Sequence, residues 1–199
     1  MLKKQSQVSL EKALDKALDF SLQFEVTEQG ETIFLGYSIF QTNSKGAYER
    51  SLLDNQDSLK KQITDLIAPD LLFQTKTALK EIIREMYAPY YTGIIGIDML
   101  IYLSGNVLRL YPCVEINMRK NMGYLAVRFS EKYLHPASHG SFSIDFNSNP
   151  ENIMQNHEQM QKQYPLIIED GKIKSGYLSL CPVTEDTNYC AFVLIKERK

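Results

Sequence analysis

The feature that most constrains the fold is a hairpin in the middle of the chain. Two strand-like runs, Tyr91 to Leu103 and Val107 to Asn117, stand on either side of Gly105-Asn106. A Gly-Asn pair is typical of the two-residue turn that joins antiparallel strands. The turn pairs Ser104 with Val107 and so fixes the register farther along both strands.

This register predicts a polar face on the hairpin. Three pairs follow from it: Asp98 with Cys113, Gly96 with Glu115, and Ile94 with Asn117. Asp98 is then a diagonal neighbour of Glu115, about 7–8 Å away between backbones, and Asn117 lies on the same face. Two carboxylates and an amide oxygen suit Mg²⁺, and Gly96 leaves room for a bound group.

Two alternatives stay open from the spacing alone. Alternating polar residues on a strand commonly form a solvated outer face. A three-residue turn would move Asp98 to the face opposite Glu115, unless a bulge near Pro112 corrected the register.

Cationic groups collect around the same hairpin. Arg109 shares its polar face, and Arg119 and Lys120 follow its second strand. Asn121 is a suitable N-cap for a helix from about Met122 to Leu134. Because free N–H groups and positive side chains gather there, the segment favours an anion.

The first third of the chain predicts a sheet with covering helices. Apolar residues alternate with polar ones from Phe20 to Val26, and a second strand from Ile33 to Gln41 follows the turn residues Glu28 to Gly30. One helix is expected after Asp57, and another from Pro69 with Leu72, Leu79, Ile82, Ile83 and Met86 facing inward. Tyr48, Glu49 and Arg50 are assigned to a loop.

The last third is expected to be rich in strands. A strand from Phe142 to Phe146 precedes a helix that Asn149-Pro150 opens and that runs to about Gln163. A meander follows, with strands at Leu166 to Glu169, Lys172 to Leu180 and Tyr189 to Ile195 and a tight turn at Asp170-Gly171. Hairpins with helices beside them predict an α+β fold with a mainly antiparallel sheet and flanking helices.

Composition narrows the class of protein. The 199 residues are 44% hydrophobic and 23% charged with a net charge of −2, which indicates one folded domain over residues 1–199 and does not suggest a nucleic-acid partner. No run is long enough for a membrane span, and the first residues lead into no apolar signal core, so a cytoplasmic protein is expected. Cys113, Cys181 and Cys190 are an odd set without zinc-site spacing, so reduced thiols are expected.

The amino-acid sequence of the hairpin resembles that of the ATP-grasp superfamily. The resemblance rests on Gly96-Ile97-Asp98-Met99, on Pro112-Cys113-Val114-Glu115-Ile116-Asn117-Met118-Arg119, and on Met122-Gly123. It implies that Asp98, Glu115 and Asn117 bind the magnesium ions that bridge the phosphates of ATP. It also implies that Arg119 faces phosphate or an acyl group, while Arg109 either lines the nucleotide cleft or caps the hairpin.

The segment Val8 to Lys16 resembles the hinge strand of the same family and the residues after it. The resemblance implies that Glu11 contacts the nucleoside, although Lys12 stands where the family has proline. An amphipathic helix that carries Leu10, Leu14 and Leu18 on its apolar side is an equal alternative.

The resemblance covers residues 8–134, as the C-terminal lobe of an ATP-grasp fold, with residues 135–199 as a β-rich extension packed on it. It implies an ATP-dependent carboxylate–amine or carboxylate–thiol ligase that acts through an acyl phosphate on an unknown carboxylate. The family's N-terminal and central lobes are expected as partners from the same protein, so full activity is not expected from these residues alone. A non-catalytic nucleotide-binding module and a protein-interaction module are the alternatives.

Overall fold

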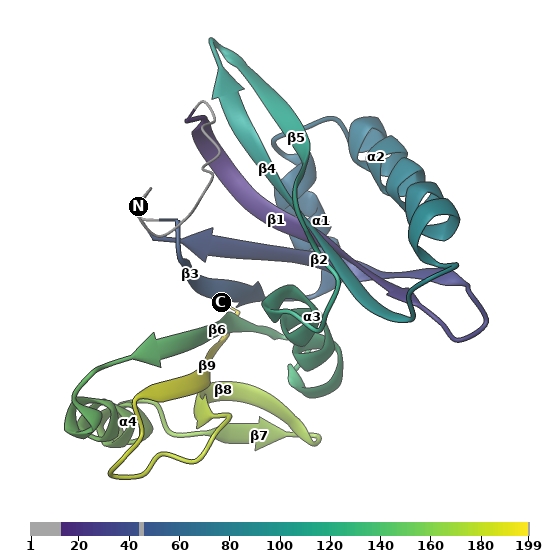
Figure 1. Cartoon of the computed structure of the whole chain (residues 1–199). Helices are drawn as coiled ribbons and strands as arrows, with labels where there is room; N and C mark the ends of the chain where they lie inside the picture. Colours follow the sequence, from purple (N-terminus) through teal and green to yellow (C-terminus); the bar gives the residue numbers. More distant parts are fainter. Residues whose placement is uncertain (1–12, 44–45, 199) are drawn as a thin grey trace, which may run out of the picture.

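The computed structural model describes residues 13–43 and 46–198 as a nine-stranded antiparallel sheet with flanking helices (Figure 1). The strands are β1 (Asp15–Val26), β2 (Thr32–Thr42), β3 (Tyr48–Leu53), β4 (Gly93–Ser104), β5 (Val107–Asn117), β6 (Ser138–Phe146), β7 (Ile167–Glu169), β8 (Lys172–Ser179) and β9 (Tyr189–Glu197). The helices are α1 (Gln56–Thr64), α2 (Pro69–Ile82), the π-helix η1 (Ile83–Tyr87), α3 (Met122–Tyr133) and α4 (Pro150–Gln163). The predicted α+β class with antiparallel pairing is therefore confirmed.

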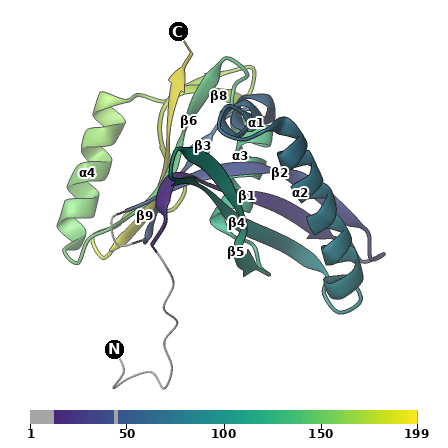
Figure 2. The same cartoon turned by 90° about the horizontal axis from the view of Figure 1, so that it is seen from above.

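The strand order is β5-β4-β1-β2-β3-β6-β9-β8-β7, and each ladder between neighbouring strands is antiparallel. Figure 2 shows α1 and α2 on the side of the first strands and α4 beside the last ones. Within the described part of the chain, no helix is long and apolar enough to cross a bilayer.

Two apolar clusters lie on this sheet. In the first, even-numbered residues of β1, from Phe20 to Val26, and odd-numbered residues of β4, from Ile95 to Ile101, pack under α1 and α2. The second joins Ala126 and Phe129 of α3 to β3, β6, β8 and β9. The side chains of Ser21 and Gln23, on the other face of β1, lie against Gly123 at the start of α3, which places α3 on the face opposite α1 and α2.

Several local predictions are confirmed. Asn149 caps α4 with Pro150 as its first residue, and Pro69 opens α2. Asp170 and Gly171 have φ angles of 50° and 74°, as the tight turn between β7 and β8 requires.

Other local predictions are wrong. Tyr48, Glu49 and Arg50 belong to β3, not to a loop, because β3 finds partners in β2 and β6. Helix α1 begins before Asp57, at Gln56, because Asn55 accepts a hydrogen bond from the N–H of Ser58 and caps it. From Asp15 to Leu18 the chain is extended, which excludes the amphipathic helix there, since these residues pair with β4.

The inward face of α2 also differs from the prediction. Ile82 and Met86 are 44% and 64% exposed, whereas Leu72 and Ile83 are buried and Leu79 and Tyr87 pack against the same cluster. The wider turn of the π-helix η1 brings Tyr87, four residues after Ile83, onto the core in place of Met86.

Candidate metal and phosphate site

The site is built on the hairpin of β4 and β5, whose register changes part-way along. Near the turn, Ser104 pairs with Val107 and Leu100 with Tyr111, as the Gly105-Asn106 turn predicts. Beyond that point the next pair is Asp98 with Glu115. In between, Met99 stands against the segment 112–114, so β5 carries two extra residues in a bulge.

Because of the bulge the predicted residue pairs are wrong, but Asp98, Glu115 and Asn117 still lie on one face, as predicted. Asp98 faces Glu115 directly, not Cys113, and Gly96 faces Asn117, not Glu115. Pro112 has no N–H to donate to the ladder, so the regular pairing ends there. Because side chains alternate with a period of two, two extra residues leave Glu115 on the same face as Asp98.

Asp98, Glu115 and Asn117 form one connected group. Asn117 is 8% exposed and donates a hydrogen bond through Nδ2 to Asp98 Oδ2 at 3.0 Å. Burial and the neighbouring Glu115 carboxylate raise the pKa of Asp98 to about 6, while the hydrogen bond from Asn117 and the charge of Arg119 oppose that rise. Two carboxylates that face each other in this way favour a bound cation.

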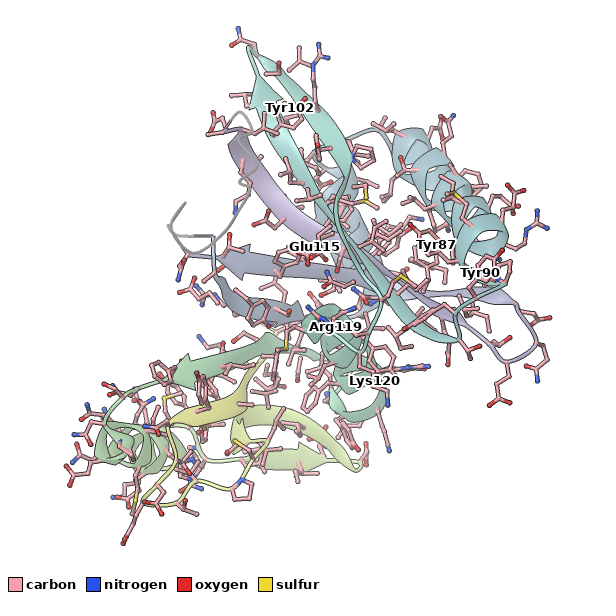
Figure 3. All side chains as sticks on the ribbon, viewed as in Figure 1. Tyr87, Tyr90, Tyr102, Glu115, Arg119 and Lys120 are labelled. Carbon is pink, nitrogen blue, oxygen red and sulfur yellow. The ribbon has the colours of Figure 1, made fainter. Side chains whose placement is uncertain are left out.

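These residues line a cavity of about 360 Å³. Ser21, Thr42 and Tyr48 line it from β1, β2 and β3, and Asn121 to Gly123 bring the start of α3. Arg119 also lines it, and Figure 3 shows Glu115 on β5 with Arg119 and Lys120 beside the start of α3. The cavity therefore joins an acidic pair to a cationic side chain and a helix N-terminus.

The start of α3 is held close to the sheet by two glycines. Asn121 caps α3, as predicted, by accepting a hydrogen bond from the N–H of Tyr124 at 3.0 Å. A Cβ on Gly123 would lie 2.4 Å from Gln23 Nε2, and one on Gly96 would lie 2.4 Å from Asn121 Nδ2. The space at Gly96 is thus filled by protein, and the prediction that it leaves room for a bound group is wrong.

Solved structures with a similar fold are ATP-grasp proteins. N5-carboxyaminoimidazole synthetase from Staphylococcus aureus, complexed with ADP, matches 93% of this chain with 13% identity and a TM-score of 0.46. The biotin carboxylase domain of Hydrogenobacter thermophilus 2-oxoglutarate carboxylase, with MgADP, ADP and bicarbonate, matches 93% with 12% identity and a TM-score of 0.49. A protein from Archaeoglobus fulgidus named for the ATP-grasp superfamily matches 90% with 13% identity and a TM-score of 0.44.

This chain spans less than half of each of these structures, with 47%, 42% and 46% of their lengths covered. No protein-family model matches the sequence. No curated protein matches it either. At these identities the matches assign no role to individual residues of this chain.

The donor set of the site fits Mg²⁺ better than a metal with a shell made only of protein ligands. Within residues 13–43 and 46–198, no group of three or more His, Cys, Asp or Glu side chains could hold a metal ion. Asp98 and Glu115 offer two carboxylates, and Asn117 keeps its amide oxygen free of Asp98 because Nδ2 makes that contact. Mg²⁺ accepts one or two carboxylates and fills the rest of its shell with water and phosphate oxygens.

Two other predicted site residues are not in this group. Arg109 pairs with Tyr102, four residues from Asp98 along β4, and does not line the cavity. Glu11 lies outside the described residues. Sequence reasoning missed Ser51 and placed Tyr48 in a loop that could reach a ligand; both line the cavity from β3 and are joined by a hydrogen bond of 3.0 Å. A period-two alternation would place Tyr48 and Ser51 on opposite faces, and β3 shifts its register against β2 between Tyr48 and Arg50.

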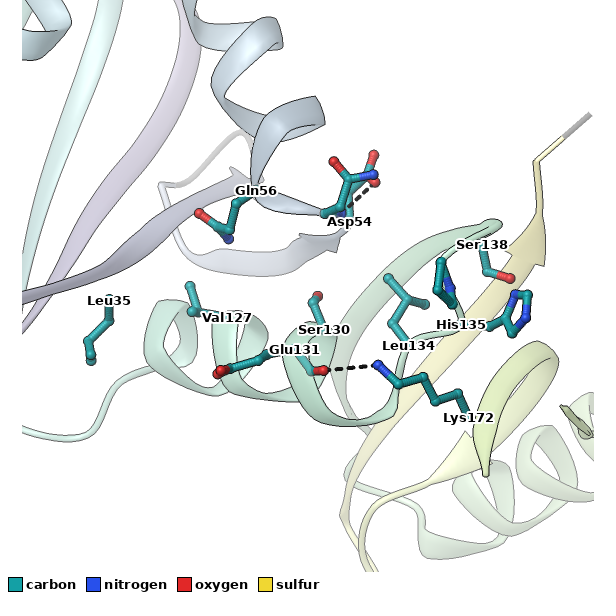
Figure 4. Close-up of a pocket in the computed structure, with 12 residues that line it drawn as sticks. Leu35, Asp54, Gln56, Val127, Ser130, Glu131, Leu134, His135, Ser138 and Lys172 are labelled. Carbon is teal, nitrogen blue, oxygen red and sulfur yellow. Dashed lines mark hydrogen bonds between the residues drawn. The ribbon is translucent and has the colours of Figure 1, made fainter. Parts of the chain in front are cut away.

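A separate cavity of about 380 Å³ lies at the other end of α3 (Figure 4). It is lined by the segment before α1 and by the end of α3, where Lys172 donates a hydrogen bond to the Glu131 carbonyl at 3.2 Å. Its described lining shares no residue with the cavity at Asp98. The acidic pair and this cavity are therefore distinct features.

Proposed function

We propose that this chain is the Mg²⁺- and phosphate-binding part of an ATP-grasp enzyme, an ATP-dependent ligase that joins a carboxylate to an amine or a thiol through an acyl phosphate. The observation that carries the proposal is the direct pairing of Asp98 with Glu115, with Asn117 bonded to Asp98, in one cavity with Arg119 and the start of α3. These residues are also the ones that carry the resemblance to the family.

The proposed roles of the site residues differ according to their charges. Asp98, Glu115 and Asn117 would hold Mg²⁺, which supplies positive charge against the phosphate oxygens of ATP. Arg119 and the free N–H groups at the start of α3 would bind phosphate oxygens from the other side of the cavity. Phosphoryl transfer is accelerated mainly by such positioning and charge stabilisation, so none of these side chains has to act as a nucleophile.

Arg119 is the proposed catalytic residue. Its side chain is exposed and lines the cavity beside the acidic pair. A guanidinium can bind two oxygens of a phosphate or carboxylate at once, so it can hold the transferring phosphoryl group next to the substrate carboxylate. The substrate and the remaining phosphate contacts are expected from the lobes of the enzyme outside these residues.

Isothermal titration calorimetry with ADP tests the proposal, with either excess Mg²⁺ or EDTA present. Binding is expected with Mg²⁺ and is expected to be lost with EDTA and in Glu115→Ala. Glu158→Ala, which removes an exposed carboxylate on α4, is the matched control and is expected to bind ADP like the unchanged chain.

These titrations, together with an assay of turnover, separate the alternatives. Mg²⁺-dependent binding without any turnover, even when the remaining lobes are supplied, would favour a non-catalytic nucleotide-binding module. A folded sample that binds ADP neither with nor without Mg²⁺ would contradict the proposed site and favour a protein-interaction module.

A further inference from the structure

A larger groove runs along one side of α3 and begins at the proposed phosphate site. Its volume is about 560 Å³, and it is lined by α3, the residues before it, and Leu180 from the segment after β8. Arg119, Asn121 and Met122 line both this groove and the cavity that contains Asp98. The two spaces are therefore neighbours that share the start of α3.

Positive charge stands at both ends of the groove. Arg119 and Lys120 lie at its start, and Lys132 lies in the last turn of α3. None of these three forms an ion pair with another residue that the structure describes, whereas Arg128, between them, is paired with Glu131 at 2.9 Å and Glu25 at 3.8 Å. In a chain with a net charge of −2, this is a local excess of unpaired cations.

The middle of the groove is apolar and partly open. Leu125 and Phe129 lie within it, and Met122, Tyr133 and Leu180 are 38%, 43% and 38% exposed. Cations stand over its two tyrosine rings, with the Arg128 guanidinium 5.7 Å from the centre of Tyr124 and Lys132 Nζ 5.2 Å from the centre of Tyr133. An occupant that fits would be apolar in the middle and negative at its ends.

The length of the groove suggests the kind of molecule. Helix α3 has 12 residues, which span about 18 Å at 1.5 Å per residue. An extended peptide covers that distance with about five or six residues, at roughly 3.3 Å each.

We propose that this groove binds an acidic polypeptide segment of about five or six residues, with a carboxylate at each end and apolar side chains between them. The end at Arg119 enters the cavity where we place the phosphates, so a carboxylate there is positioned for activation. That last step rests on the proposed function. Docking of the peptide along α3 does not rest on the proposed function, because Lys120 and Lys132 can bind its carboxylates without nucleotide or metal.

Fluorescence anisotropy of the whole chain tests the proposal in EDTA and without nucleotide. The labelled probe is the acetylated and C-terminally amidated peptide Glu-Leu-Leu-Phe-Glu, and the comparison peptide, capped in the same way, has Gln at both ends. Binding of the acidic peptide is expected, with affinity reduced at least about threefold in Lys120→Gln and in Lys132→Gln. Lys60→Gln, an exposed lysine of α1, is the control and is expected to leave affinity unchanged.

Several results would overturn the proposal: no binding of the acidic peptide, equal affinity for the two peptides, or equal affinity in Lys132→Gln and Lys60→Gln. Binding of phosphatidylserine vesicles in place of the peptide, or self-association that Lys132→Gln abolishes without any peptide binding, would do so too. Loss of Mg²⁺-dependent ADP binding with peptide binding retained contradicts only the proposed function. Loss of peptide binding with Mg²⁺-dependent ADP binding retained contradicts only this inference.

Discussion

Asp98 of β4 and Glu115 of β5 stand directly opposite each other, and Asn117 donates a hydrogen bond to Asp98. A pair of carboxylates on adjacent strands destabilises a sheet, because like charges directly opposite each other repel. Burial, and after it the charge of Glu115, raises the pKa of Asp98 to about 6, so the ionised carboxylate is costly in the folded protein. Such a local loss of stability is expected where a side chain binds a ligand and does not support the fold.

The first prediction is that Asp98→Asn stabilises the metal-free protein at pH 7.5. The folded-state pKa of Asp98 lies above its ordinary value of 3.8, so the folded protein binds this proton more tightly than the unfolded chain. The unchanged protein therefore loses stability as the pH rises from about 4 to 6, and the variant avoids that loss. Since Asp98 is only partly buried, we expect the free energy of unfolding of Asp98→Asn to exceed that of the unchanged protein by about 1–2 kcal/mol at pH 7.5 and by almost nothing at pH 4.

Urea unfolding in EDTA at the two pH values measures this difference. Asp186→Asn, at an exposed loop carboxylate, is the control and is expected to change stability little at either pH. A loss of stability in Asp98→Asn at pH 7.5 would show that the carboxylate supports the fold and would contradict the prediction.

The second prediction concerns the contact between α3 and β1. In Gly123→Ala, the new Cβ would stand 2.4 Å from Gln23 Nε2 and 2.9 Å from Ser21 Oγ. We expect the free energy of unfolding to fall by about 1–3 kcal/mol, because overpacking outweighs the gain in helix propensity.

A double-mutant cycle with Gln23→Ala checks the cause of that loss. Gln23 is fully buried and its Oε1 has no hydrogen-bond partner in the described structure, so its removal clears the space for the new methyl group. The two substitutions together are expected to cost at least about 1 kcal/mol less than the sum of their separate effects. Additive losses would mean that the clash with Gln23 is not the cause.

The sequence was sufficient for the hairpin turn and insufficient for the register beyond it. Gly105-Asn106 determines the pairs nearest the turn through local backbone geometry alone. The bulge depends in addition on tertiary packing: Met99 is 1% exposed in the core, and β5 passes this point with Pro112 in its strand. Since either two or three residues of a bulged strand can oppose one residue of its partner, Pro112 indicates a bulge but not its size.

Strand β3 was missed for a related reason. It is short and carries Glu49 and Arg50, and its partner β6 lies about ninety positions later in the chain, as the pair Ser51 with Phe142 shows. Pairing over such a separation is not encoded in a local pattern. As a result Ser51 was not expected at the site and Tyr48 was assigned to a loop, although the hairpin residues were expected there.

The third prediction is that Asn117→Asp lowers stability without metal and increases the response to Mg²⁺. The substitution removes the amide that donates to Asp98 and brings a third carboxylate next to Asp98 and Glu115. We expect a loss of about 1–2 kcal/mol in EDTA, because a hydrogen bond is replaced by charge repulsion.

Thermal unfolding with EDTA and with 10 mM Mg²⁺, about a hundredfold above a sub-millimolar dissociation constant, measures the response. Mg²⁺ is expected to raise Tm more in Asn117→Asp than in the unchanged chain, because it neutralises the added charge. Asn188→Asp, in the segment before β9, also removes an amide donor, here to the Asn147 carbonyl, but lies outside the cavity lining and is the control. Equal Mg²⁺ responses in all three proteins would argue against metal binding by this group.

The fourth prediction distinguishes the contributions of two arginines to ADP binding, since the resemblance places both near the nucleotide. Arg119 lines the cavity, whereas Arg109 pairs with Tyr102, which is about 13 Å along β4 from Asp98 at 3.3 Å per residue. Arg119→Gln is therefore expected to weaken Mg²⁺-dependent ADP binding about tenfold, the value of one charge-assisted hydrogen bond, and Arg109→Gln less than threefold. Both side chains are exposed, so neither change should alter stability by more than about 0.5 kcal/mol.

Calorimetry at 50 and 300 mM salt completes this comparison. A contact between Arg119 and phosphate inside the cavity is screened less by salt than a long-range attraction from Arg109. The ratio of affinities between the unchanged chain and Arg119→Gln should therefore persist at 300 mM salt, while any effect of Arg109→Gln should vanish. If Arg109→Gln instead produced the larger and salt-resistant loss, the nucleotide would extend along β5 toward the turn, and the cavity at α3 would not be its phosphate site.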